Sequence, residues 1–188
     1  AIVDVASAVV DAGVTALEVT ADTRGVTEKI GTLTETFENV SVGAGTVLDS
    51  ETARAVQLAG GEFLVTPTVE TEVIETGNRY GTPVVCGAYT PTEALTAFEA
   101  GADLVKVFPA ETGGPEHVAA IAGPLGQVPL VPTGGVGPSN AGAYVEAGAV
   151  AVAAGGGIVS EDALAEEDYE TITDNARQVL DAVESARD

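Results

Sequence analysis

A lysine set among apolar residues is the strongest chemical signal in this sequence. Lys106 lies within Leu104–Phe108 (LVKVF), with a valine on each side, in a chain that has only two lysines. Burial disfavours the charged form of an amine and lowers its pKa, and only the neutral amine attacks a carbonyl. Lys106 therefore predicts Schiff-base chemistry with a carbonyl substrate. The alternative is a buried lysine neutralised by a neighbouring carboxylate, without a catalytic role.

Polar residues also occur near the ends of other apolar runs, and these are Glu18, Thr20, Thr46, Thr66 and Thr133. Strand alternation places Glu18 and Thr20 on one face. Barrel enzymes build their sites at the carboxyl ends of their strands. A single carboxylate near a Schiff-base lysine is suited to carry protons. Glu18 is therefore a candidate proton carrier, although an ion-pair partner for Lys106 without that role would leave the same pattern.

Glycine clusters follow the last two apolar runs, as Gly134-Gly135 and Gly155-Gly156-Gly157. Barrels often bind phosphate through backbone N–H groups in the loops after their last two strands. Glycine pairs also mark ordinary tight turns. Because they occur in both of these loops, they favour a phosphate site at Gly134, Gly135, Gly156 and Gly157.

Short apolar runs alternate with amphipathic segments along the whole chain. Seven runs are candidate strands: 16–20, 41–47, 63–67, 83–90, 104–110, 129–135 and 149–157. Continuous apolar runs of this kind suit parallel strands that are buried on both faces. Glycines just before several runs, at positions 13, 60, 101 and 148, suit the left-handed ends of helices. The segment 92–100 is one of the expected helices.

The alternation predicts an α/β fold of the TIM-type (β/α)8 barrel class, with residues 1–188 as a single domain. A closed barrel of this class has eight strands, and the chain opens directly in an expected helix, 3–11. We therefore expect the first strand to lie upstream of this sequence. An open, doubly wound parallel sheet is the alternative.

The charge is strongly acidic, with 29 acids against seven bases and a net charge of −22. Such a surface repels nucleic acid and anionic membranes, which basic patches bind. No apolar run is long enough for a membrane helix, and no signal peptide is evident. The single cysteine, Cys86, suits a reducing cytoplasm. A halophilic, salt-rich cytoplasm would screen the self-repulsion and is the preferred context; an acidic protein from an ordinary cell is the alternative.

Three other signals point to no separate site. His117 lies in an expected helix without a cysteine or histidine partner, so we expect no metal site. Cys86 reads as a small core residue. Gly43 and Gly45 lack the third glycine of a dinucleotide fingerprint.

Several motifs in order resemble those of a known family. They are LEVT (17–20), GAGTVL (43–48), VTP (65–67), TPTE (90–93), KVFPA (106–110) and PTGG (132–135). The set resembles the 2-keto-3-deoxy-6-phosphogluconate (KDPG) aldolases, which include 4-hydroxy-2-oxoglutarate (KHG) aldolases.

The resemblance implies a lyase, a class I aldolase without metal or cofactor, commonly a homotrimer. Lys106 would form the Schiff base, and Glu18 would move protons through a bound water. Thr46, Pro67, Phe108 and Thr133 would line the pyruvyl pocket, and Gly134, Gly135, Gly156 and Gly157 would hold the phosphate. The reaction would be reversible cleavage of KDPG to pyruvate and glyceraldehyde 3-phosphate, a sugar-acid catabolic step of the Entner-Doudoroff type. The sequence does not indicate gluconate or galactonate stereochemistry, nor whether the unphosphorylated acid is accepted.

Two positions depart from the family pattern. Asp22 stands where familiar members carry a substrate-binding arginine, with Arg24 two residues on, and Gly157 stands where many carry a phosphate-binding serine. Two other hypotheses remain beside the aldolase. One is a phosphosugar isomerase or epimerase barrel in which Lys106 acts electrostatically, and the other is a non-catalytic binding barrel.

Overall fold

The computed structural model describes residues 2–188, and the chain divides into two compact units. The central unit is Thr15–Lys106, and the terminal unit combines Ala1–Val14 with Val107–Asp188. Each unit is described by itself. That residues 1–188 form a single domain stays a prediction.

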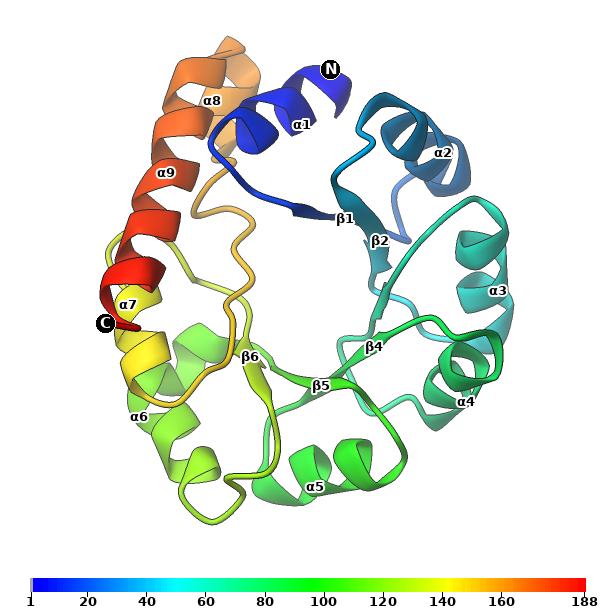
Figure 1. Cartoon of the computed structure of the whole chain (residues 1–188), viewed down its shortest axis with the longest axis vertical. Helices are drawn as coiled ribbons and strands as arrows, with labels where there is room; N and C mark the ends of the chain where they lie inside the picture. The colour runs from blue at the N-terminus through cyan, green and yellow to red at the C-terminus, as the bar shows by residue number, and fades with distance from the viewer. Residues whose placement is uncertain (1) are drawn as a thin grey trace. The chain divides into compact units, whose positions relative to one another are not determined.

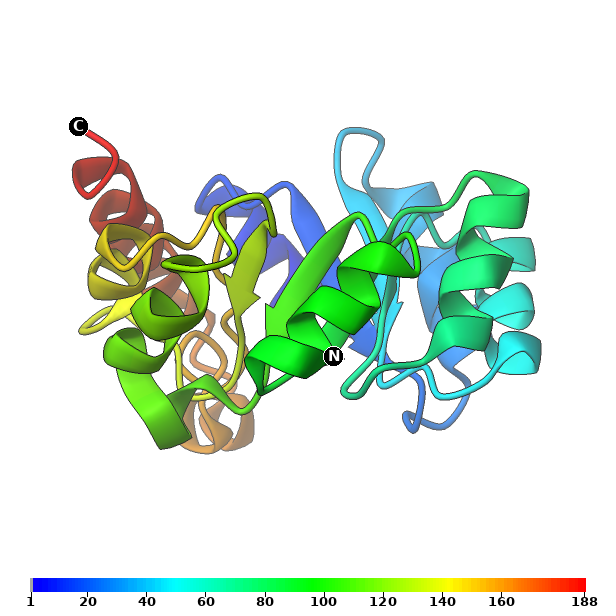
Figure 2. The same ribbon diagram turned by 90° about the horizontal axis from the view of Figure 1, so that it is seen from below.

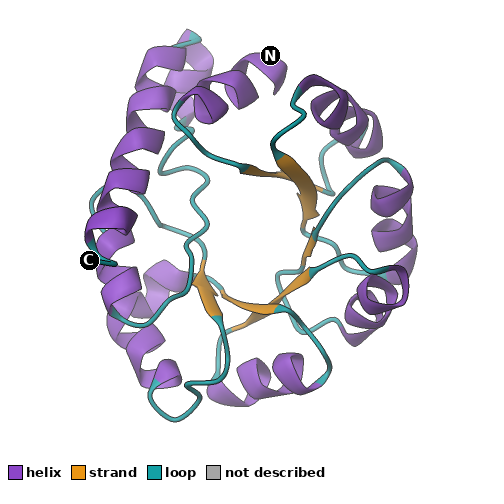
Figure 3. Ribbon diagram, viewed as in Figure 1, coloured by secondary structure: helices purple, strands orange, loops and turns teal. Residues whose placement is uncertain are grey.

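Strands and helices alternate strictly in the central unit. The elements are β1 (Ala16–Thr20), α2 (Val26–Thr36), β2 (Ser41–Gly45), α3 (Ser50–Leu58), β3 (Leu64–Val65), α4 (Thr71–Tyr80), β4 (Val84–Ala88), α5 (Pro91–Glu99) and β5 (Leu104–Val107), whose last residue belongs to the terminal unit. The strands follow one another in the sheet in chain order, and the pairs β1–β2, β2–β3 and β3–β4 are parallel. Figure 1 labels these elements, and Figure 3 shows helices α2 to α5 along one face of the strands.

Strands β2 to β5 are largely buried, whereas only Val19 of β1 is buried. Val42, Leu64, Val84 and Val105 have no exposed surface. The register sets Glu18 opposite Gly43 and Thr20 opposite Gly45 across β1 and β2. The apolar runs of β2, β3 and β4 were therefore correctly interpreted as buried parallel strands, whereas β1 is parallel but largely exposed.

Local sequence signals set where the helices begin and end. Thr90 and Glu93 form a reciprocal capping box at the start of α5, which explains why the expected helix at 92–100 begins at Pro91. Gly60 and Gly101 follow helices at φ +93° and +99°, in the left-handed region that favours glycine. In the terminal unit Gly13 and Gly148 do the same at +108° and +103°. The predicted glycine caps are confirmed.

The terminal unit is mainly helical. Its elements are α1 (Ile2–Asp11), α6 (Ala110–Ala122), β6 (Leu130–Pro132), α7 (Ala141–Glu146), α8 (Glu161–Glu166) and α9 (Tyr169–Ser185). Helix α1 packs along α9, where the Thr173 hydroxyl donates to the Ala8 carbonyl at 2.8 Å. Figure 2 shows α7 beside α9, and a Cβ atom at Gly142 would lie only 3.1 Å from the Ala182 carbonyl oxygen. The expected helix at 3–11 is confirmed.

The seventh strand predicted at 149–157 does not form. Only Ala153 pairs there, in an isolated parallel bridge with Thr133. The amides of Val150 and Ala153 donate to Leu130 and Pro132, so these two bonds are three residues apart on the donor side. A strand keeps a two-residue period, and this spacing breaks it. The small residues and glycines of the segment therefore run beside β6 without forming a ladder.

Between residues 2 and 188 no helix is long and apolar enough to cross a membrane. Nor do three or more His, Cys, Asp or Glu side chains gather in that range as a group that could hold a metal ion.

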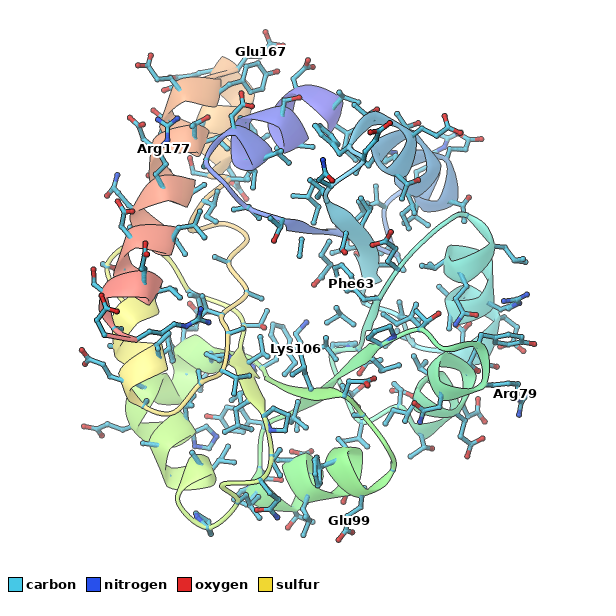
Figure 4. All side chains as sticks on the ribbon, in the orientation of Figure 1. Phe63, Arg79, Glu99, Lys106, Glu167 and Arg177 are labelled. Atoms are coloured by element: carbon cyan, nitrogen blue, oxygen red, sulfur yellow. The ribbon has the colours of Figure 1, made fainter. Side chains whose placement is uncertain are left out.

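The excess of acids lies largely at the surface, and this makes stability depend on salt. Glu99, Glu167 and the basic Arg79 project from the outer sides of their helices or turns (Figure 4), and Arg177 pairs with Asp174 at 3.5 Å, where both side chains are exposed. Exposed pairs of this kind contribute little to stability. Repulsion among the remaining acids is therefore the larger surface electrostatic effect.

We predict that the melting temperature rises as KCl is raised from 0.1 to 1 M, measured by circular dichroism at neutral pH. The Debye length falls from about 10 to about 3 Å over that range. Each kcal/mol of repulsion that is screened should raise the melting temperature by about 2–4 °C for a chain of this size. An unchanged or falling melting temperature over this range would contradict the prediction.

Candidate active site

Lys106 is buried within strand β5 of the central unit. Its side chain is only 5% exposed, and Val105 and Val107 beside it are fully buried. Figure 4 shows the Lys106 side chain on the side of β5 opposite to helix α5. The predicted burial of this lysine is therefore confirmed. An amine in this position has exchanged most of its water for protein.

Glu18 extends from β1 over a glycine of the neighbouring strand. A Cβ atom at Gly45 would lie 1.7 Å from the Glu18 carboxyl oxygen Oε1, so no other residue type fits at position 45 without displacing the carboxylate. On the same strand a Cβ at Gly43 would lie 2.5 Å from the Phe63 ring. As a sequence signal these two glycines indicate only an incomplete nucleotide fingerprint. The structure shows instead that they leave room for larger side chains.

The Glu18 carboxyl and the Lys106 amine act on each other electrostatically. Burial raises the pKa of Glu18, and the positive charge of Lys106 partly opposes that rise. Burial lowers the pKa of Lys106, and the negative charge of Glu18 partly opposes that fall. The Glu18 side chain is exposed when taken as a whole, but its carboxyl is the part crowded against Gly45. Burial thus favours the neutral form of both groups, and their attraction favours the charged pair.

The meeting of these two groups requires a curved sheet. Strands β1 and β5 lie at opposite ends of the strand order within the central unit. Glu18 and Lys106 interact across that order because the strands turn one face toward a common space, as they do around a barrel. The sequence places both residues in strands, and the curvature brings them together.

Thr46 and Pro67 follow β2 and β3 at the carboxyl ends of those strands. Thr46 has φ +56°, a left-handed conformation that is rare for a β-branched residue and costs conformational energy. Pro67 lies against β4, where a Cβ at Gly87 would be 2.2 Å from the Pro67 carbonyl carbon. Strain of this kind is concentrated at functional sites, which favours Thr46 as a candidate site residue.

The Thr66 side chain is buried at the end of β3, where it makes hydrogen bonds within the protein. Its hydroxyl donates to the Thr68 carbonyl at 2.6 Å and accepts from the Gly87 amide at 3.0 Å. Cys86 Sγ lies 3.5 Å from the same hydroxyl, and the cysteine is fully buried. Cys86 is thus a core residue, as predicted, and Thr66 joins the end of β3 to β4.

Two bases follow β1, Arg24 in the loop and Lys29 in the first turn of α2. Lys29 Nζ donates to the carbonyl oxygen of Arg24, which ties the start of α2 to this loop. The Arg24 side chain is exposed, and its guanidinium makes no ion pair or hydrogen bond with residues 2–188. Asp22 is also exposed.

In the terminal unit, the loop after β6 lies against the segment that follows β5. The Thr133 carbonyl accepts from the Ala110 amide at 2.8 Å, and the Thr133 amide donates to Val107 at 3.0 Å. Phe108 is 36% exposed. A Cβ at Gly134 would lie 3.3 Å from its ring. Phe108, Thr133 and Gly134, all predicted site residues, are therefore neighbours.

The glycine segments of the terminal unit also come together. Gly134 and Gly135 have φ of +93° and +71°, and a Cβ at Gly157 would lie 2.2 Å from the Val136 carbonyl oxygen. Gly156 is exposed and open on its Cβ side. Within residues 2–188 the amides of Gly134, Gly135, Gly156 and Gly157 donate to no other protein group. Backbone N–H groups left in this state are suited to an anion.

A family model described as KDPG and KHG aldolase matches residues 1–175. The chain belongs to this aldolase family. The KHG/KDPG aldolase of Escherichia coli K12 is 36% identical over 98% of this chain and 86% of its own length. The 2-dehydro-3-deoxy-phosphogluconate aldolase of Treponema pallidum is 35% identical, over 96% of this chain and 87% of its own length. The predicted family and enzyme class, a class I aldolase and hence a lyase, are confirmed.

Solved structures of the aldolase family agree with the fold. A native KDPGal structure has a TM-score of 0.91 and 30% identity over 99% of this chain and 89% of its own. The KDPG aldolase of Legionella pneumophila, with pyruvate captured as a covalent carbinolamine, has a TM-score of 0.85 and 30% identity over 95% and 87%. This agreement confirms the predicted fold class, a parallel α/β fold of the (β/α)-barrel type.

We predict that Glu18→Gln shifts the pH dependence of imine formation at Lys106 to lower pH. The Glu18 carboxylate raises the pKa of Lys106, so its removal lets that pKa fall further and neutral amine persists in more acidic solution. The measurement is the rate of cyanoborohydride trapping of pyruvate between pH 5 and 9, followed by mass spectrometry. An unchanged profile would show that the two groups are not coupled, and a shift to higher pH would show that Glu18 does not raise the pKa of Lys106.

Proposed function

We propose that this aldolase cleaves 2-keto-3-deoxy-6-phosphogluconate reversibly to pyruvate and glyceraldehyde 3-phosphate through a Schiff base on Lys106. The observation that carries the proposal is the buried Lys106 amine, whose pKa is lowered by desolvation and which interacts electrostatically with the Glu18 carboxyl. A neutral amine is the form that attacks a ketone.

The chemistry begins when the Lys106 amine adds to C2 of the keto acid. The carbinolamine loses water and becomes a protonated imine. The C4 hydroxyl then gives up its proton, and the C3–C4 bond breaks to release the aldehyde, while its electrons pass into the imine to form an enamine. Protonation of C3 and hydrolysis of the imine release pyruvate and restore the amine.

Glu18 is the residue we propose for the proton transfers, through a bound water. Its raised pKa supports this role, because a carboxyl that titrates nearer to neutral pH both gives and takes protons more readily. Thr46, Pro67, Phe108 and Thr133 are proposed to line the pyruvyl pocket. The pyruvate carbinolamine of the Legionella pneumophila relative supports imine chemistry in this family.

The phosphate is proposed to bind the amides of Gly134, Gly135, Gly156 and Gly157. Their N–H groups donate to no protein group within residues 2–188, which supports an anion there. The family member from Zymomonas mobilis was solved with 3-phosphoglycerate, at 29% identity over 94% of this chain and 83% of its own. Another E. coli K12 relative is named a 2-dehydro-3-deoxy-6-phosphogalactonate aldolase, 35% identical over 82% of this chain and 74% of its own. Cleavage assays should therefore compare KDPG, its galactonate isomer and KHG. The predicted homotrimer and cytoplasmic location stay predictions.

The first test is to trap pyruvate with borohydride and to locate the adduct by peptide mass spectrometry. The adduct is expected on Lys106 and is expected to be lost in Lys106→Ala. Lys29→Ala is the matched control, because Lys29 is the only other lysine in the chain and should leave trapping intact. Full cleavage activity in Lys106→Ala would end the proposal that Lys106 forms the imine. A parent protein that cleaves no keto acid and traps no pyruvate would favour the isomerase or epimerase alternative, which forms no imine. Glu18→Gln should slow turnover while trapping continues.

A second test concerns the carboxylate of the keto acid. We propose that Arg24 binds it, because Arg24 is on the loop that follows Glu18 and its guanidinium has no protein partner within residues 2–188. Arg24→Gln should raise KM for KDPG about tenfold, as expected from the loss of one charged hydrogen bond. Arg79→Gln is the matched control, since Arg79 projects from the outer side of α4 (Figure 4) and should leave KM unchanged. Equal KM in the two variants would remove Arg24 from the site.

A further inference from the structure

One side chain braces the loop between β6 and α7. Asn140 Oδ1 accepts a hydrogen bond from the Gly137 amide at 2.9 Å, and Asn140 Nδ2 donates to the Gly135 carbonyl at 2.9 Å. The two ends of the carboxamide thus hold the backbone on both sides of Val136. Val136 itself is 1% exposed, so the braced segment is anchored in the core.

This use of Asn140 differs from the usual one for its position. Asn140 is the residue that precedes the first turn of α7, yet its side chain makes no hydrogen bond to the helix amides. Asparagine at such a position normally accepts from the second or third amide of the helix. Both polar ends of Asn140 serve the loop instead, which indicates that the conformation of the loop is what this residue maintains.

The braced segment includes half of the proposed phosphate site. Gly135 lies between Asn140 and helix α6, since a Cβ at Gly135 would be 2.4 Å from the Glu111 Cβ. The Glu111 amide also donates to the Gly134 carbonyl at 3.1 Å. With these carbonyls engaged, the peptide planes at Gly134 and Gly135 are fixed while their own N–H groups remain without a protein acceptor in residues 2–188.

The other half of the proposed phosphate site packs on the same segment. The Cβ position of Gly157 lies 2.2 Å from the Val136 carbonyl oxygen and 2.8 Å from the Gly137 Cα. The residues clamped by Asn140 are therefore the surface on which the 155–157 turn rests. A shift of Gly137 would move both groups of amide donors.

We propose that Asn140 is a positioning residue for the phosphate end of the substrate, which it serves by holding the Gly134–Gly137 backbone in the anion-binding conformation. The inference rests on the proposed phosphate site. Donors fixed before binding need no ordering when the anion arrives, so affinity is gained without a direct contact from Asn140.

The experiment compares two substrates in Asn140→Ala, namely KDPG and unphosphorylated 2-keto-3-deoxygluconate. KM for KDPG is expected to rise about tenfold, because the variant loses two neutral hydrogen bonds and part of the loss is recovered by relaxation. kcat/KM for the unphosphorylated acid, and the trapping of pyruvate on Lys106, should stay within about twofold of the parent, the spread expected from a neutral surface change. Ser139→Ala is the matched control from the same loop and should alter neither substrate.

A second variant covers the case in which Asn140→Ala does not fold. Asn140→Asp keeps an acceptor for the Gly137 amide, loses the donor to Gly135, and adds a negative charge near the amides. It should raise KM for KDPG relative to the parent, and 1 M KCl should recover part of that loss by screening.

The outcomes separate the two proposals. If the parent prefers KDPG but the Asn140 variants lose nothing on it, or lose equally on both acids, the positioning role is overturned while the phosphate site stands. If the parent shows equal KM for both acids, the phosphate site fails and the positioning role fails with it. If the parent traps no pyruvate, the aldolase proposal itself fails.

Discussion

The removal of one amine from water is the constraint on which the rest of this structure depends. Lys106 lies in a strand whose neighbouring positions are fully buried, and burial lowers its pKa. A buried ammonium would need a nearby negative charge, and a lone buried carboxylate would need a positive one. Glu18 and Lys106 meet both needs only in part, since burial still favours the neutral form of each. Burial and mutual attraction therefore act in opposite directions on the pKa of each group.

Glycines leave space for several of the side chains and turns around the proposed site. Gly45 leaves space for the Glu18 carboxyl, Gly43 for the Phe63 ring and Gly87 for the turn at Pro67. In the terminal unit Gly157 allows one turn to rest directly on the carbonyl of Val136. At each place a methyl group would meet another atom closer than van der Waals contact permits. A larger residue at any of these glycine positions would therefore displace a neighbouring group, and some of those groups are proposed to act in catalysis or anion binding.

The acidic surface and the proposed anionic substrate set opposite electrostatic demands. A chain with a net charge of −22 repels a phosphorylated keto acid at long range, and the Debye length limits that repulsion when salt is present. Backbone amides offset this repulsion at the site itself. They attract an anion without adding a side-chain charge that needs its own partner. This is consistent with a proposed phosphate site built from glycines and braced by an uncharged Asn140.

Local signals along the chain predicted six of the seven strands, the glycine ends of the helices and the burial of Lys106. Apolar runs and left-handed glycines determine structure over a few residues, so they can be recognised in the sequence without knowing which elements pack against them. The seventh run failed because its small residues and glycines do not keep a strand period beside β6. Other features depend on tertiary structure and could not be predicted from local signals. They are the interaction of Glu18 with Lys106, the space at Gly45 for the Glu18 carboxyl, the hydrogen bonds of the Thr66 hydroxyl and those of the Asn140 side chain. Each depends on sheet curvature or on the close approach of backbones, and those distances are set by how whole elements pack.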